Sequence, residues 1–284
     1  MPGTPLDPAA MARRAAQELF SGAVVALGPG IPCYLPGELS STDGVWFLAD
    51  SGILGIQEMG LDADAVDAGG NTVALLTGGA YTGVVDIAGI LRGGHTSLAF
   101  LQPSQVAANG DFVHWTTEAT EGLFAPGPAV DMAYGASTVV AVMPHQYPSG
   151  RSNIVERCGL PVDGIGQVDI IVTDAAVMKT GPDGLELVEI APGWTTEEIE
   201  AITDAPLAVS SGLKEMTFQV PTLGPLNKVY PSAMDALKDV PEGSTINVDG
   251  FAGPGGMAHY LMVGLRDLGV KGLQLISNTA GVAR

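Results

Sequence analysis

The stretch WFLADSGILG, residues 46 to 55, determines how the region around it folds. Its apolar start continues from Val45 and predicts a buried strand, and Asp50 stands directly at the end of that strand. Ser51 and Gly52 then turn the chain into a second apolar segment. Burying an unpaired carboxylate costs free energy or raises the pKa of the group. The sequence therefore predicts that Asp50 is either a structural turn residue or a carboxylate that carries chemistry.

Along the rest of the chain, short apolar strands alternate with helical stretches and Gly/Pro turns, which is typical of α/β proteins. Runs such as STVVAVMP and VDIIVTDAAVM are continuously apolar, which favours strands buried on both faces of a largely parallel sheet. Helices are predicted over residues 8–20, with Asp7 near the cap, and over 195–202. Strands are predicted over 23–28, 45–49, 72–76, 97–102, 137–144, 168–173 and 185–190.

The composition excludes several classes of protein. Of the 284 residues, 46% are hydrophobic, and the formal net charge of −19 argues against direct binding to nucleic acid but not against an anionic small ligand. No uninterrupted apolar stretch reaches about 18 residues, and the first residues predict an amphipathic helix, so neither a transmembrane helix nor a signal peptide is expected. Cys33 and Cys158 lie far apart and the four histidines lack metal-ligand spacing. We expect a cytoplasmic protein without a disulfide framework or metal.

After Pro206 the character of the sequence changes, and residues 206–225 predict a linker or wrapping segment. Beyond this segment the pattern of the first residues is repeated. AMARRAAQELFSGAVVALGPGIP near the beginning parallels SAMDALKDVPEGSTINVDGFAGPGG at 232–256, and WFLADSGILG parallels LQLISNTAGVA, so that Asn278 falls where Asp50 falls. This indicates either two homologous halves or the common appearance of unrelated α/β units.

Several collinear motifs resemble one enzyme family. Region 8–205 is similar to the B subunit of the 3-oxoacid (succinyl-CoA type) CoA-transferases, and region 226–284 resembles the first part of the family's A subunit. The B-like motifs are LGPGIP (27–32), DSGILG (50–55), LRGGHTSLAFLQPSQVAANGDFVHW (91–115), PGPAVDMAYGAS (126–137), CGLPVDG (158–164), VDIIVTDAAV (168–177) and ELVEIAPGWTTEEI (186–199). The resemblance implies an α/β fold with an open mixed or parallel sheet and flanking helices, followed by a partial second homologous domain. The domains implied are 1–205 (B-like), 206–225 (linker) and 226–284 (A-like).

The same resemblance implies which residues form the site. The family segment reads Ser-Glu-Asn-Gly with the glutamate as nucleophile, and Asp50 stands at that position, one methylene shorter. Gly127 matches a backbone N–H donor for the oxyanion, but Pro128 replaces the next family glycine and has no N–H. Substrate contacts are expected from Gly28, Gly30, Ser51, Gly52, Gln105, Gly250, Phe251, Gly253, Gly255 and Asn278.

Three functions stay open at this point. The chain exchanges CoA between carboxylic acids; or, because Asp50 replaces glutamate, it is an acyl-CoA hydrolase or a C–C-cleaving relative; or it is a non-catalytic scaffolding subunit. The resemblance implies acyl-CoA and carboxylic acids as ligands, coenzyme A as a substrate and no tightly bound cofactor. It also implies a hetero-oligomer with a second polypeptide that carries the rest of the A-like half, and no nucleic-acid or membrane partner.

Overall fold

The computed structural model describes residues 3–39, 44–56, 65–116, 127–181, 184–224, 229–248 and 258–277. These residues fall into two compact units, Met1–Leu226 and Asn227–Arg284, each of which is described by itself.

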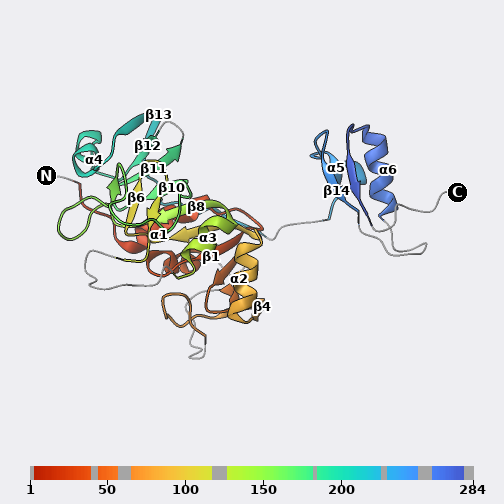
Figure 1. Ribbon diagram of the computed structural model, residues 1–284, viewed down its shortest axis with the longest axis horizontal. Helices are drawn as coiled ribbons and strands as arrows, with labels where there is room; N and C mark the ends of the chain where they lie inside the picture. The colour runs from red at the N-terminus through yellow and green to blue at the C-terminus, as the bar shows by residue number, and fades with distance from the viewer. Residues whose placement is uncertain are drawn as a thin grey trace. The chain divides into compact units, whose positions relative to one another are not determined.

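The first unit is built on one ten-stranded sheet with the order β13-β12-β11-β10-β8-β5-β1-β2-β3-β4 (Figure 1). Its central strands β10, β8, β5, β1 and β2 run parallel. Antiparallel pairing extends the sheet through β3 and β4 on one side and through β11 and β12 on the other, where β13 then pairs with β12 in parallel. The expected open mixed sheet is therefore confirmed. The strands are β1 (Val24–Leu27), β2 (Trp46–Ala49), β3 (Ile53–Ile56), β4 (Leu75–Tyr81), β5 (Thr96–Leu101), β8 (Ala136–Val142), β10 (Ile170–Val172), β11 (Ala176–Gly181), β12 (Gly184–Ile190) and β13 (Leu207–Glu215).

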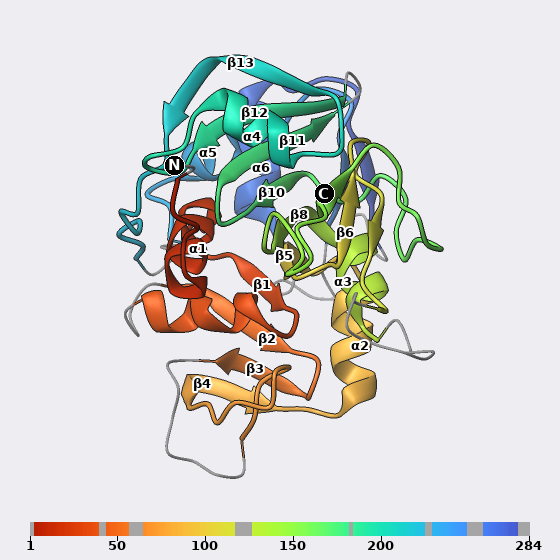
Figure 2. The same ribbon diagram turned by 90° about the vertical axis from the view of Figure 1, so that its left-hand side faces the viewer.

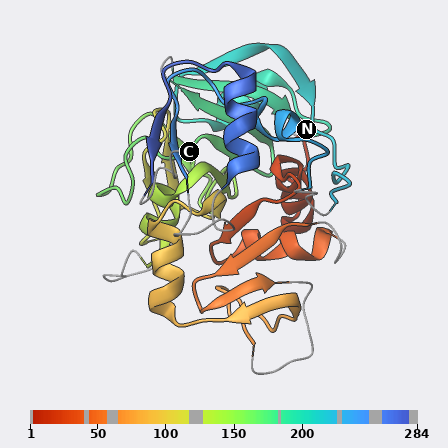
Figure 3. The ribbon, with the colours of Figure 1, turned by 90° about the vertical axis from the view of Figure 1, so that its right-hand side faces the viewer.

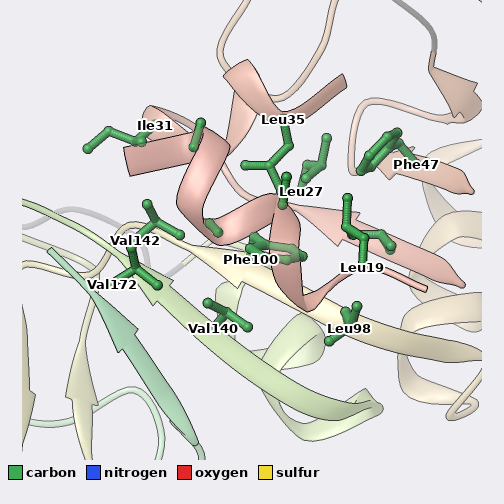
Figure 4. Packing of buried hydrophobic residues seen from close by; sticks show 14 of the residues in the cluster. Leu19, Leu27, Ile31, Leu35, Phe47, Leu98, Phe100, Val140, Val142 and Val172 are labelled. Carbon is green, nitrogen blue, oxygen red and sulfur yellow. The ribbon is translucent and has the colours of Figure 1, made fainter. Parts of the chain in front are cut away.

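Helices cover both faces of the central sheet, as continuous apolar strands require. One face carries α1 (Pro8–Ala15), η1 (Ala16–Glu18) and η2 (Ile31–Glu38), and the other carries α2 (Val84–Arg92) and α3 (Ala129–Gly135), as the opposite views in Figures 2 and 3 show. Alternate residues of each strand point to opposite faces. Leu27 and Phe100 thus pack beneath Ile31 and Leu35 of η2 (Figure 4), whereas Ala26 packs with α2 and α3.

Smaller elements complete this unit. A three-stranded sheet is formed by β6 (Gln105–Ala107), β7 (Phe112–Val113) and β9 (Ile154–Val155). The helix α4 (Thr196–Ile202) begins after a capping box, in which Thr195 Oγ1 accepts the N–H of Glu198 and the Glu198 carboxylate accepts the N–H of Thr195. The predicted start of this helix is therefore correct to one residue.

Three predictions of local structure differ from what is observed. The strand predicted over 72–76 is β4, Leu75–Tyr81. The run VDIIVTDAAVM forms two antiparallel strands, β10 and β11, because Thr173–Ala175 turn the chain. Part of the predicted linker is the edge strand β13, whose weak apolar pattern reflects its exposure, and Met216 beyond it is buried against the α1 side of the core.

The second unit contains α5 (Ala233–Leu237), β14 (Thr245–Asn247), α6 (His259–Leu268) and β15 (Gln274–Ile276). Its two strands pair in parallel with Thr245 opposite Gln274, and Gln274 donates its N–H to the Ser244 carbonyl at 2.9 Å. In the first unit Val24 lies opposite Trp46, which donates to the Ala23 carbonyl at the same distance. The two members of the sequence repeat therefore share one strand register.

Candidate active site

Asp50 lies at the carboxyl end of β2, in the turn that leads to β3. The neighbouring strand β1 is parallel, and its last residue, Leu27, is the partner of Ala49. Gly28 and Asp50 therefore leave the sheet side by side. Open α/β sheets bind ligands at this edge, outside the carboxyl ends of their parallel strands.

The turn of Asp50 is fixed by backbone contacts of Gly52. Its N–H donates to the Ala49 carbonyl at 3.1 Å, and its carbonyl accepts the N–H of Thr82 at 2.8 Å, just before α2. Gly52 has φ +103°, and a Cβ added there would lie 2.4 Å from the Thr82 carbonyl oxygen. Only glycine fits this position, so Gly52 sets the direction in which Asp50 leaves the strand.

The Asp50 carboxyl group is half-buried, and its environment disfavours the charged form. Burial raises its pKa, the backbone N–H groups of Ser51 and Asp50 oppose this, and the charge of Asp67 raises the pKa further. No Lys or Arg among the described residues forms an ion pair with Asp50. A carboxylate with a raised pKa and without a counter-ion is typical of a functional position.

The loop after β1 is held close to β5. The Gly28 N–H donates to the Phe100 carbonyl at 2.8 Å. Gly30 has φ +90° and is the N-cap of η2, and the carbonyl oxygen of the Gln102 side chain lies where a Cβ on Gly30 would be. That oxygen accepts the Ile31 N–H at 2.7 Å. Gln102 thus holds the loop beside the candidate site, and the sequence reasoning missed this contact, although the place of Gln102 directly after β5 was a signal for it.

The other predicted site residues are placed as follows. The Ser51 hydroxyl donates to the Val66 carbonyl at 2.8 Å, and the Gln105 side-chain oxygen accepts the Gly159 N–H at 3.1 Å, within the lobe of the small sheet. Gly127 is exposed, has φ +60° and immediately precedes Pro128, the N-cap of α3. The structure thus places Gly28, Ser51 and Gly52 beside Asp50, and Gly30 follows in the loop after β1. Their substrate contacts stay predictions. Gly250, Phe251, Gly253, Gly255 and Asn278 lie outside the described residues.

Comparison with known proteins assigns the chain to a family. A model of the coenzyme A transferase family matches residues 9–201. The chain belongs to the coenzyme A transferase family. The predicted family of enzymes is therefore confirmed, and the site at Asp50 lies within the matched region.

Among coenzyme A transferases, the chain is similar to the B subunit of the succinyl-CoA:3-ketoacid enzyme from Helicobacter pylori, with 34% identity over 206 residues that cover 70% of this chain and 98% of the relative. It is 36% identical over 201 residues to the B subunit of 3-oxoadipate CoA-transferase from Pseudomonas putida, covering 69% and 94%. These relatives confirm the resemblance to B subunits. The matched regions cover only the B-like part, so the predicted fusion to an A-like part stays a prediction.

The fold is also that of solved structures. Acyl-CoA transferase YdiF from Escherichia coli superposes with a TM-score of 0.63 at 20% identity, over 79% of this chain and 47% of that one. The chain thus spans about half of that longer protein. Among the described residues, no helix combines the length and the apolar character that crossing a membrane requires. The described part of the chain likewise holds no cluster of three or more potential metal ligands.

Proposed function

We propose that this chain exchanges CoA between carboxylic acids and that Asp50 is the nucleophile. One observation carries the proposal: a chain of the coenzyme A transferase family holds a half-buried carboxyl group at the carboxyl end of β2, beside the glycine loop after β1. The position is also that of the family nucleophile in the sequence resemblance described above.

The chemistry follows from a carboxylate meeting a thioester. An Asp50 oxygen attacks the thioester carbonyl carbon, the C–S bond breaks, and CoA leaves as the thiolate. The thiolate sulfur then attacks the carboxyl carbon of Asp50 in the mixed anhydride. The C–O bond from that carbon breaks, the first acid departs as its carboxylate, and CoA stays on Asp50 as a thioester. A second carboxylate reverses both steps and takes the CoA.

Gly127 is proposed as the N–H donor to the oxyanion of these steps. It is exposed at the start of α3, a helix that leads into β8, so this helix start is directed toward the carboxyl edge of the parallel strands. Pro128 has no N–H, and the site therefore has one backbone donor there where the family has a pair of glycines. The loss of a single oxyanion donor typically costs about 10²–10³ in kcat.

We also propose that residues 226–284 are the start of an A-like half and that further A-like sequence, expected on a second polypeptide, covers them. The shared register of β14–β15 and β1–β2 supports this. So does exposure, because Tyr260, Leu275 and Ile276 are 70%, 49% and 59% exposed. A two-stranded sheet with exposed apolar residues needs more structure to be stable.

Two substitutions of Asp50 test the proposed exchange. Asp50→Asn should abolish CoA exchange and leave the unfolding transition unchanged, because the amide is a similar shape but not a nucleophile. Asp50→Glu restores one methylene, and we expect it to raise exchange relative to hydrolysis, since about 1 Å of misplacement can cost 10²-fold. Steady-state assays of both products decide this. Full activity of Asp50→Asn would refute the nucleophile, and hydrolysis as the sole activity of the unmodified protein would favour the hydrolase.

A further inference from the structure

A closed loop, residues 65–73, surrounds a buried carboxylate next to the Asp50 turn. The Val73 N–H donates to the Ala65 carbonyl at 3.0 Å and closes the loop. Inside it, Asp67 is only 5% exposed. One of its oxygens accepts the N–H groups of Gly69 and Asn71, both at 2.8 Å, and the Asn71 side-chain amide contacts both oxygens at 3.0–3.1 Å.

All of these donors are neutral N–H groups, so they fix the carboxylate without cancelling its charge. No Lys or Arg in the described part of the chain forms an ion pair with Asp67. The network therefore holds the Asp67 side chain inside its own loop, where Oδ1 accepts three N–H groups and Oδ2 accepts one. Asp67 is consequently a negative charge in a fixed position.

This loop is attached to the Asp50 turn. The Ser51 hydroxyl donates to the Val66 carbonyl at 2.8 Å, so that the residue after Asp50 is bonded to the residue before Asp67. On the other side the loop lies against η2, where a Cβ added to Gly69 would be 3.3 Å from Cys33 Sγ. Burial, and after it the Asp67 charge, raises the pKa of the Cys33 thiol to about 12. The thiol is therefore neutral, and Asp67 is the charged group of this loop that acts on Asp50 through its field.

We propose that Asp67 is a positioning residue whose fixed charge disfavours the free Asp50 carboxylate and so favours every uncharged form of Asp50. Those forms are the protonated acid and, resting on the proposed function, the acyl anhydride and the CoA thioester. Repulsion between like charges acts only on the ionised form, and it is relieved when the Asp50 oxygen is acylated or replaced by sulfur. Asp67 thereby shifts the equilibrium between free enzyme and covalent intermediate without touching the substrate.

The rise in the pKa of Asp50 and the shift toward the CoA-loaded enzyme are linked in size. At a pH well above the pKa of Asp50, where the free carboxyl group is ionised, each unit by which Asp67 raises that pKa also multiplies the equilibrium ratio of CoA-loaded to free enzyme by ten. Like charges near a protein surface interact weakly enough that we expect a change of a few-fold to about tenfold. Burial, which is the larger cause of the raised pKa of Asp50, is unchanged when the Asp67 charge is removed.

The test is a titration of the Asp50 carboxyl carbon by NMR in the full chain, with Asp67→Asn beside the unmodified protein. The amide keeps an oxygen to accept the Gly69 and Asn71 N–H groups, and the charge is lost together with the one bond from the Asn71 side chain to the second oxygen. Asp67→Asn should lower the pKa of Asp50. Glu200→Gln, which removes an exposed charge from α4, is the matched control and should leave the pKa of Asp50 unchanged. Exchange protection of the Gly69 and Asn71 amides verifies that the loop is intact.

Ser51→Ala is a second variant, since it cuts only the bond to Val66 and should lower the pKa of Asp50 by less. An Asp50 titration that is the same with and without the Asp67 charge overturns the inference. The intact mass of the chain after incubation with acyl-CoA then measures how much of it carries CoA. Asp67→Asn should lower the ratio of CoA-loaded to free chain by the factor that the titration gives. If Asp67→Asn lowers the pKa of Asp50 but the unmodified chain never acquires CoA, the electrostatic inference is supported and the proposed function is refuted.

Discussion

At the scale of single residues, the Asp50 turn depends on the absence of a side chain at Gly52. Gly52→Ala should destabilise the protein by about 1–3 kcal/mol, because its φ of +103° disfavours an L residue and its Cβ would meet the Thr82 carbonyl at 2.4 Å. Gly89→Ala is the control, since this α2 residue has open space around it, and it should be neutral or stabilising by up to about 1 kcal/mol. Denaturant unfolding measures both. Equal effects would show that the turn is not constrained.

The residues of the site differ in how far the sequence could predict them. The place of Asp50 followed from local rules, an apolar strand ended by a turn, and the structure has that strand and turn. Gln102 contacts Ile31, and the loop of Asp67 is joined to the Asp50 turn by the bond from Ser51 to Val66, and no local pattern encodes either of these contacts. His145 follows the predicted strand 137–144 directly. Its two ring nitrogens lie within hydrogen-bond distance of the hydroxyls of Thr173 and Thr203, and burial lowers its pKa to about 4.

At the scale of elements, the parallel strands at the centre of the sheet were predicted, whereas β3, β11 and the edge strand β13 were not. The predicted ranges for β1, β2 and β5 end within one residue of the observed strands, because burial on two faces imposes a continuous apolar run. The range for β12 is equally close, and there the signal is alternation of buried and partly exposed residues. The edge strand β13 is exposed along most of its length and therefore carries little pattern. The strand predicted over 168–173 contains β10, whereas β11 was not predicted as a strand of its own, because the short turn before it is itself buried at Ala175.

The helix α1 is attached to the sheet by a buried ion pair. Arg14 contacts Glu189 of β12 at 2.6 Å and Glu18 at 2.8 Å, and Arg14 and Glu189 are only 5% and 4% exposed. Arg14→Met should destabilise the protein by about 3–5 kcal/mol, because Glu189 would stay buried with only Lys214 beside it. Arg13→Met, which breaks the more exposed pair with Glu38, should cost less than about 1 kcal/mol. Similar shifts of the unfolding midpoint would contradict this.

At the scale of the whole molecule, the proposal of an A-like half can be tested without an activity assay. Amide hydrogens of β14 and β15 should exchange rapidly in the 284-residue chain, since two short strands with exposed Leu275 and Ile276 are weakly stabilised. They should become protected when an A-type partner polypeptide is added, while β1 and β2 amides stay protected throughout. Equal protection of all four strands in the chain alone would contradict the proposal.

The most direct test of the account is the mass of the protein after incubation with an acyl-CoA. If Asp50 is the nucleophile, a fraction of the chain gains the mass of CoA less one water, and peptide mapping places the thioester on Asp50. The adduct should disappear on addition of an acceptor carboxylic acid and should never form in Asp50→Asn. An unchanged mass, or an adduct mapped to another residue, would contradict the covalent role of Asp50.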